Sequence, residues 1–120
     1  MELGEGRACD YAIGFLEDAQ GKIVAVYGAR LEGRDASGHV TYRVTDDFPY
    51  PKLQEGFDFV YFNCRSASKH DFTLVAVVKA DREKQWWDAV LWAKQYEFAS
   101  GKFVDVRTEG VSCANESWGL

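Results

Sequence analysis

The stretch DREKQWWDAVLWAKQYEFASG, residues 81–101, decides the fold that we predict. Placed at 100° per residue, most of its apolar side chains fall on one broad arc, opposite a polar face. Asp81 suits the N-cap of a helix, and Gly101 suits the left-handed residue that follows a helix end. The pattern therefore predicts one long amphipathic helix over residues 82–100.

Trp92 does not fit the apolar arc of this helix. It falls among the polar positions, with Asp88 one turn before it and Tyr96 one turn after it. Tryptophan and tyrosine at the border of a polar face are typical of interaction surfaces. We predict that Asp88, Trp92 and Tyr96 form a stripe that binds a partner protein or a second copy. The alternatives are that a loop or the tail with Trp118 covers the stripe, or that it stacks a small molecule.

Strand patterns fill most of the chain before the helix, and one follows it. β-Branched and aromatic residues, in places alternating with polar ones, mark these segments. Residues 72–79 are almost continuously apolar, so this strand should be central, with both faces covered, and should form a hairpin with residues 57–64. The predicted strands are 11–16, 22–31, 39–45, 57–64, 72–79 and 102–108.

These elements predict an α+β fold, in which a curved, mainly antiparallel sheet of five to seven strands has the helix packed across it. The length of 120 residues is that of one domain and the composition marks no linker, so we predict a single domain over residues 1–120. The predicted core consists of Val60, Phe62, Leu74, Ala76, Val78, Trp86, Val90 and Ala93.

One segment resembles a known family. Residues 72–95 read as an apolar strand, then Ala80-Asp81-Arg82-Glu83, then a tryptophan-bearing helix. This order resembles the end of pleckstrin-homology domains, and the resemblance implies a barrel that a helix tryptophan plugs. The chain departs from the family in its strand pattern after the helix. It also has an acidic turn, residues 17–21, in place of a basic pocket, so we do not expect lipid-headgroup binding.

A second candidate binding segment lies at residues 46–52, Asp-Asp-Phe-Pro-Tyr-Pro-Lys. Two prolines in three residues preclude a central strand or a helix interior here. Irregular segments that carry aromatic side chains are common locations of function. We therefore name Phe48 and Tyr50 as binding residues. The alternative is that both rings fold back on the core.

Charge and hydropathy limit the partners and the location. The net charge of −5 argues against nucleic acid or an anionic membrane as the partner, and leaves a protein partner or a homo-oligomer, with a small molecule as a further option. No apolar run approaches the ~18 residues of a membrane span. The N-terminus lacks the basic-then-apolar pattern of a signal peptide. We therefore predict a cytoplasmic protein.

The chain carries little recognisable chemistry. Cys9, Cys64 and Cys113 are too few and too widely spaced for a disulfide framework, so we predict buried, reduced thiols. There is no phosphate-binding loop, no nucleophile elbow and no Cys or His pair at metal-ligand spacing, so we expect no cofactor and no metal. The weak catalytic candidate is a thiol–imidazole pair, Cys64 with His70, across a predicted turn.

Three functions remain open. The first is a non-enzymatic protein-binding module, such as an acidic inhibitor or immunity-type protein, because the chain is small and acidic and lacks catalytic motifs. The second is a small-molecule-binding or enzymatic half-barrel with an aromatic pocket between sheet and helix. The third is a self-assembling structural subunit.

Overall fold

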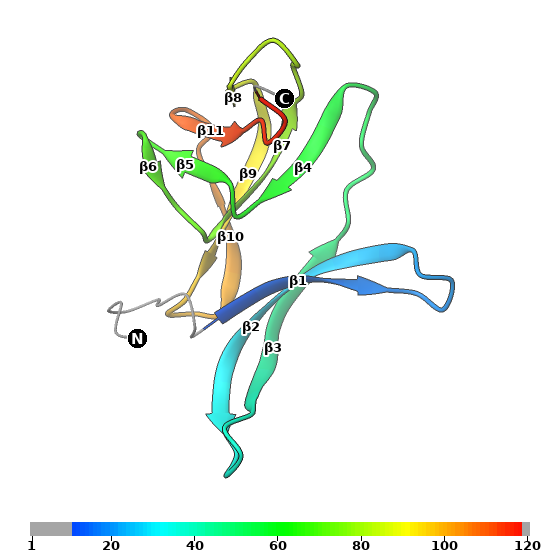
Figure 1. Ribbon diagram of the computed structural model, residues 1–120, viewed down its shortest axis with the longest axis vertical. Helices are drawn as coiled ribbons and strands as arrows, with labels where there is room; N and C mark the ends of the chain where they lie inside the picture. Colours follow the sequence, from blue (N-terminus) through cyan, green and yellow to red (C-terminus); the bar gives the residue numbers. More distant parts are fainter. Residues whose placement is uncertain (1–10, 119–120) are drawn as a thin grey trace. The chain divides into compact units, whose positions relative to one another are not determined.

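The computed structural model describes residues 11–118, which form β-strands in three antiparallel sheets and no helix (Figure 1). The α+β prediction is therefore wrong. Contacts group the described residues into two compact units: unit 1 comprises residues 11–50 and 96–103, and unit 2 comprises residues 51–95 and 104–118. The single domain over residues 1–120 stays a prediction. Nowhere in residues 11–118 does a helix occur that is long and apolar enough to cross a membrane.

The stretch over residues 82–100 folds as turns and strands. The carboxylate of Asp81 accepts the backbone N–H of Glu83 at 2.9 Å, as an N-cap residue would, but it caps a turn because no helix follows within residues 82–118. Gly101 has the left-handed conformation that the sequence predicts, with φ of 71°, but it closes the turn between two strands. The strands in and after the stretch are β8 (Trp86–Trp87), β9 (Val90–Glu97) and β10 (Lys102–Val106).

A β-bulge explains why this stretch imitates a helix. Where β9 pairs with β7 (Leu74–Lys79), Leu91 is an extra residue and is 58% exposed. The bulge turns Val90 and Ala93, three residues apart, toward the same core. That spacing is the i, i+3 spacing of a helix face, so the periodicity does not separate the two structures. The aromatic and β-branched side chains of the stretch fit a strand.

The resemblance to pleckstrin-homology domains is lost with the helix. Trp86 and Trp87, the tryptophans that would plug a barrel, lie on the two-residue strand β8. The barrel-plus-helix fold therefore does not describe residues 11–118.

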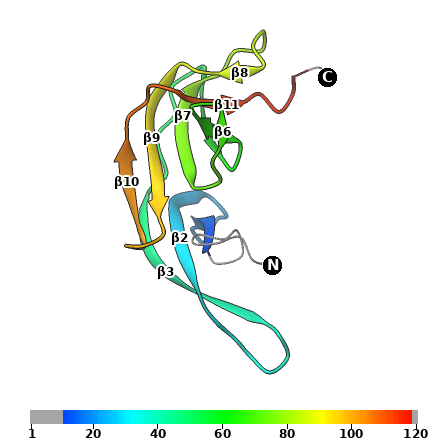
Figure 2. The same cartoon turned by 90° about the vertical axis from the view of Figure 1, so that its left-hand side faces the viewer.

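Unit 1 is built on an antiparallel meander in the order β1-β2-β3. Among residues 11–118, β1 pairs with β2 as far as Arg30, and β3 is the strand that pairs with β2 from Leu31 to Arg34. Figure 2 shows this part as a two-stranded ribbon, which we call the arm (residues 31–43). β3 also extends to Pro49, into the segment that we predicted to be irregular. The strands are β1 (Tyr11–Glu17), β2 (Ile23–Arg34) and β3 (Val40–Pro49).

Tyr96 anchors the turn between β9 and β10 within unit 1. Its side chain is 1% exposed, and its ring lies so close to Gly28 that a Cβ there would be 2.4 Å from a ring carbon. The ring centroids of Tyr11 and Phe103 lie 5.9 and 5.3 Å away. The Tyr96 hydroxyl shares a hydrogen bond of 2.6 Å with the hydroxyl of Thr45. This cluster is the packed centre of unit 1.

Unit 2 contains most of a sheet in the order β10-β9-β7-β4 and all of a smaller sheet in the order β6-β5-β11-β8. The antiparallel pairing that we predicted between residues 57–64 and 72–79 is confirmed as the β4–β7 pair. The two strands do not form a simple hairpin, because β5 and β6 of the smaller sheet lie between them in the chain. In the smaller sheet, the Arg65 guanidinium lies 3.6 Å over the Trp86 ring and donates to Ser112 at 2.8 Å. The strands not yet bounded are β4 (Phe57–Tyr61), β5 (Cys64–Ser66), β6 (Lys69–His70) and β11 (Val111–Ala114).

The core of unit 2 lies between these two sheets. The predicted core residues that are buried there are Val60, Leu74, Ala76, Val78 and Ala93. Val90 is partly buried against them. Phe62 does not belong to the core, because its side chain is 40% exposed and its backbone is left-handed, with φ of 67°. As we predicted, β7 is buried on both faces, since Val75 and Val77 are also covered.

A disulfide joins the two longer strands of the small sheet. Cys64 on β5 and Cys113 on β11 lie directly opposite each other and are bonded, and neither side chain is exposed. The prediction of reduced thiols is therefore wrong for these two residues. Cys9 lies outside the described residues. The bond closes a loop across 49 positions of sequence, which ties the C-terminal strand to the middle of the chain.

Candidate functional site

The stripe that we predicted from helical geometry does not form. Asp88 lies in the turn before β9 and pairs with Lys84 at 3.3 Å. Trp92 is half-buried on β9, with its ring centroid 6.2 Å from that of Phe59. Tyr96 is the buried centre of unit 1. The three side chains therefore share no continuous surface, and binding through any of them stays a prediction.

The aromatic side chains of residues 46–52 both make ring contacts within unit 1. Phe48 packs edge-to-face on Phe103 with centroids 4.9 Å apart. Tyr50 packs edge-to-face on Phe15 with centroids 5.9 Å apart. These contacts agree with the alternative that the rings fold back. A binding role for Phe48 and Tyr50 stays a prediction.

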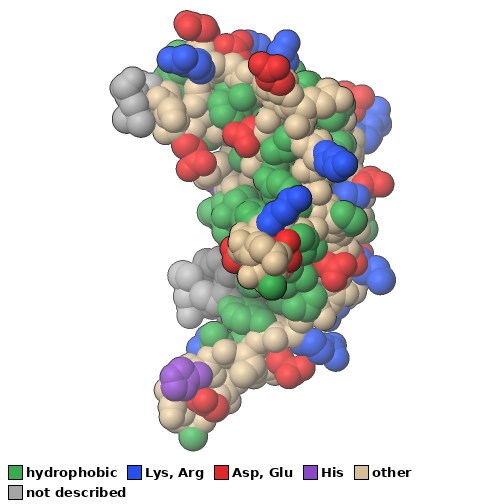
Figure 3. Space-filling model, turned by 90° about the vertical axis from the view of Figure 1, so that its right-hand side faces the viewer, with side chains coloured by type: hydrophobic (Ala, Val, Ile, Leu, Met, Phe, Trp, Pro, Cys, Tyr) green, Lys and Arg blue, Asp and Glu red, His purple; other side chains and the backbone are tan. Residues whose placement is uncertain are grey.

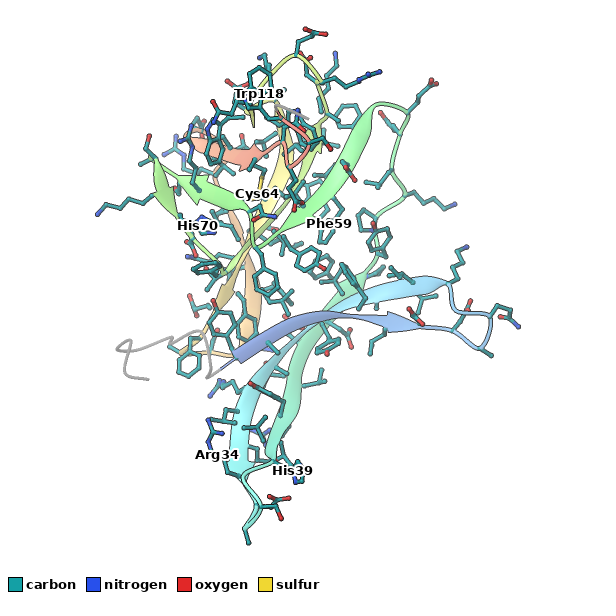
Figure 4. The ribbon with its side chains drawn as sticks, viewed as in Figure 1. Arg34, His39, Phe59, Cys64, His70 and Trp118 are labelled. Carbon is teal, nitrogen blue, oxygen red and sulfur yellow. A yellow bond between two sulfur atoms is a disulfide. The ribbon has the colours of Figure 1, made fainter. Side chains whose placement is uncertain are left out.

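The weak catalytic pair is not assembled. The sulfur of Cys64 is bonded to that of Cys113, so it offers no thiolate as a nucleophile. The Nε2 atom of His70 lies 2.5 Å from the carbonyl oxygen of Phe62, and the His70 ring lies 4.3 Å from that of Phe72. Figure 4 shows Cys64 and His70 on neighbouring segments. The imidazole therefore orders the turn of unit 2 and does not activate Cys64.

The outer edge of β3 is the candidate site that the structure adds. Within residues 11–118, β3 is the last strand in the order β1-β2-β3, so it is an edge strand of that sheet. Val40, Tyr42 and Val44 alternate along it and are 40%, 40% and 49% exposed. An edge with outward backbone groups and apolar side chains is a template for another strand. We call residues 40–44 the exposed edge.

The turn at the tip of the arm is well ordered by one carboxylate. Asp35 accepts the backbone N–H groups of Ser37 and His39, each at 2.9 Å. Its second oxygen lies 3.2 Å from Nδ1 of His39. Figure 4 shows Arg34 at the end of β2 and His39 just before β3, on either side of this turn. The turn therefore holds β2 and β3 in register far from the packed centre of unit 1.

Charge does not single out another site. On the face that Figure 3 shows, acidic and basic side chains are interspersed among hydrophobic ones. Within residues 11–118, no three His, Cys, Asp or Glu side chains gather closely enough to hold a metal ion. The site that emerges offers backbone hydrogen bonding and apolar contact, and no acid–base pair.

The alternating sequence of residues 39–45 indicates a strand, but it does not indicate that the apolar face of this strand is exposed. We expected residues 39–45 to be a half-exposed strand with its polar side chains, Thr41 and Arg43, in water. The structure also leaves the apolar face exposed, at Val40 and Val44. Alternation predicts that a strand has two unlike faces, but it does not show what covers the apolar one.

Comparison with known proteins assigns no family: no protein-family model, no curated protein and no solved structure matches this chain.

Proposed function

We propose that this protein is a non-enzymatic protein-binding module that pairs with a second copy of itself along the exposed edge, residues 40–44. The observation that carries this proposal is the arm, whose β3 strand ends its sheet within residues 11–118 and presents exposed apolar side chains. The proposal joins the first and third functions that the sequence leaves open. The second, a pocket between sheet and helix, requires a helix that residues 11–118 do not form.

The arm lacks what normally stabilises two strands in water. A two-stranded hairpin is marginal by itself, and a third strand or a packed face is usually needed. From Leu31 to Arg34, β2 has only β3 as a strand neighbour among the described residues. The side chains of Leu31, Val40 and Val44 lie on or beside this ribbon and are partly or largely exposed. A second copy that added a strand would supply the missing neighbour.

The features that protect β3 from pairing with another chain lie outside the exposed edge. Proteins guard edge strands with charges, prolines and bulges. From Thr45 onward, β3 has a register shift, two aspartates and Pro49, and the carboxylate of Asp46 accepts the backbone N–H of Phe103 at 2.8 Å. Over residues 40–44 the sequence is Val-Thr-Tyr-Arg-Val, with one charge. This contrast favours pairing at residues 40–44 and not farther along.

The sequence of the exposed edge is self-complementary. An antiparallel pair of two copies, with the twofold axis through Tyr42, sets Val40 of one copy opposite Val44 of the other. It also sets Thr41 opposite Arg43, so that no like charges meet. Moving the axis to Arg43 would place two guanidinium groups opposite each other, which is destabilising. We therefore propose the register centred on Tyr42.

This pairing predicts a dimer whose stability depends on the exposed edge. We expect sedimentation equilibrium of the full chain to give twice the mass of one chain, and Val44→Lys to reduce the association constant at least about tenfold, because a charge would enter an apolar strand pair. The matched control is Val24→Lys. Val24 is 45% exposed but lies on the central strand β2, so this variant should remain dimeric.

A monomer at all concentrations would contradict the proposal. So would a dimer that Val44→Lys and Val24→Lys weaken equally, since the contact would then lie elsewhere. Circular dichroism of both variants should match the wild type, because each substitution is at an exposed position.

The disulfide bears on the cellular compartment in which the protein works. The sequence favours the cytoplasm, but disulfides persist mainly in oxidising compartments. We propose that the protein works where the Cys64–Cys113 bond is stable. Alkylation of thiols in freshly lysed cells tests this, and two reactive thiols at positions 64 and 113 would restore the cytoplasmic assignment.

A further inference from the structure

A groove at one end of unit 2 is separate from the exposed edge of β3. It has a volume of about 830 Å³, within the range of small-molecule sites. Two indole rings border it, Trp87 and Trp118, together with Arg82, Asn115 and Ser117. A smaller cavity of about 190 Å³ is also lined by Trp87, Asn115 and Ser117. Figure 4 shows Trp118 at the end of unit 2 near β8 and β11.

The two walls of the groove are tied to each other. One wall is the loop over residues 80–85, and the other is the segment over residues 115–118. The backbone N–H of Asn115 donates to the carbonyl of Gln85, and its side-chain amide donates to the carbonyl of Lys84, both at 2.9 Å. Asn115 is 8% exposed. The hydrogen bonds of the buried Asn115 therefore fix the two walls of the groove relative to each other.

Each tryptophan is oriented by its own wall. The Nε1–H of Trp87 donates to the carbonyl of Asp81 at 2.8 Å, so this ring offers a ligand its apolar surface. The backbone N–H of Trp118 donates to the carbonyl of Asn115 at 3.0 Å, and that of Ser117 donates to the Asn115 side chain at 3.1 Å. The turn that results leaves the Trp118 side chain 48% exposed beside the groove.

The polar groups restrict the kind of ligand. Arg82 and Glu83 are adjacent in the lining, and Glu116 borders the smaller cavity. In the groove an anion would meet the carboxylate of Glu83, and a cation would meet the guanidinium of Arg82. The amide of Asn115 and the hydroxyl of Ser117 add neutral hydrogen-bonding groups. This lining suits a neutral molecule that has an apolar face and a hydroxyl-rich rim.

We propose that this groove binds a neutral oligosaccharide, with a pyranose ring stacked on Trp118 and a neighbouring ring against Trp87. A pyranose presents C–H groups on its faces and hydroxyl groups around its edge. It therefore matches two indole surfaces that are bordered by amide, hydroxyl, guanidinium and carboxylate groups. The site is independent of the β3 edge, so a monomeric variant should retain it.

The test is a titration of the full chain with neutral hexasaccharides of glucose, mannose and N-acetylglucosamine, and with hexagalacturonate as the anionic comparison. We expect at least one neutral hexasaccharide to bind saturably and to shift the indole N–H resonances of Trp87 and Trp118. Trp118→Ala should weaken that binding by about tenfold or more. Phe72→Ala is the matched control, because Phe72 is 50% exposed but does not line the groove.

Three results would overturn the proposal. One is the absence of saturable binding by every neutral hexasaccharide at millimolar concentration. Another is tighter binding of hexagalacturonate than of any neutral sugar. The third is an equal loss of affinity in Trp118→Ala and Phe72→Ala. The unfolding temperature of both variants should stay near that of the wild type, so that a lost affinity reports the groove.

Discussion

Replacing the disulfide by the double substitution Cys64→Ala and Cys113→Ala should lower the free energy of unfolding by about 4 kcal/mol. The bond spans 49 positions, so breaking it releases a long loop in the unfolded chain. Both side chains are fully buried between the sheets of unit 2, and β11 has only short strands, β5 and β8, as neighbours.

Urea denaturation of the wild type and the double variant measures this loss, and the unfolding temperature should fall by about 10–20 °C. The wild type in a reducing agent should unfold at the same urea concentration as the double variant. If reduction and the double substitution both leave the free energy of unfolding unchanged, the bond either does not form or does not stabilise unit 2.

Tyr96→Ala should cost about 3–5 kcal/mol of unfolding free energy, as large-to-small substitutions of buried aromatic residues do. The variant removes the ring that packs on Gly28, Tyr11 and Phe103. Within residues 11–118, it also leaves the hydroxyl of Thr45 with only its 3.4 Å hydrogen bond to the carbonyl of Gly28. Tyr96→Phe keeps the ring and should cost only about 1 kcal/mol. Chemical denaturation of the two variants separates packing from hydrogen bonding.

Comparing the destabilisation of Tyr96→Ala with that of Leu91→Ala distinguishes the strand structure of residues 81–101 from the predicted helix. In a helix, Leu91 would face the sheet and Tyr96 would lie at the polar border, so Leu91→Ala would cost more. In the structure, Leu91 is 58% exposed at the bulge and Tyr96 is 1% exposed. We therefore expect Leu91→Ala to change the free energy of unfolding by less than about 0.5 kcal/mol. A larger destabilisation by Leu91→Ala than by Tyr96→Ala would support the helix instead.

A double-mutant cycle localises the contact. A methyl group at Gly28 would sit 2.4 Å from the Tyr96 ring, so Gly28→Ala should be destabilising in the wild type. In the Tyr96→Ala background the same substitution should cost much less, because the ring is gone. Equal costs in the two backgrounds would mean that Gly28 and Tyr96 do not touch.

The strands were predictable because their patterns extend over enough residues. Continuous apolar sequence identified β7 as the central strand, and alternation identified β3. The segment around Leu91 was not predictable by periodicity, since one bulge residue gives a strand the spacing of a helix. The short strand β11 was also missed, because its Val-Ser-Cys-Ala sequence has too few residues to show a period.

The disulfide and the candidate site could not be predicted from the sequence, because both depend on which strands pair. Three cysteines allow several pairings, and only the antiparallel register of β5 and β11 places Cys64 opposite Cys113. The exposed edge depends on which strands flank β3, which is a property of topology. Tyr96 shows the reverse error: its position beside polar residues suggested exposure, although Gly28, far away in sequence, leaves room for its ring.

The proposed pairing is tested most directly by a cysteine at Tyr42, introduced in a Cys9→Ser background. In the register centred on Tyr42 this residue faces itself in the second copy, at the separation of directly opposed strand residues, which suits a disulfide. Under mild oxidation Tyr42→Cys should form a covalent dimer in high yield. Arg43→Cys, which faces Thr41 of the second copy, and Val24→Cys should not. A lack of cross-linking at Tyr42→Cys, or equal cross-linking at all three positions, would contradict pairing along the exposed edge.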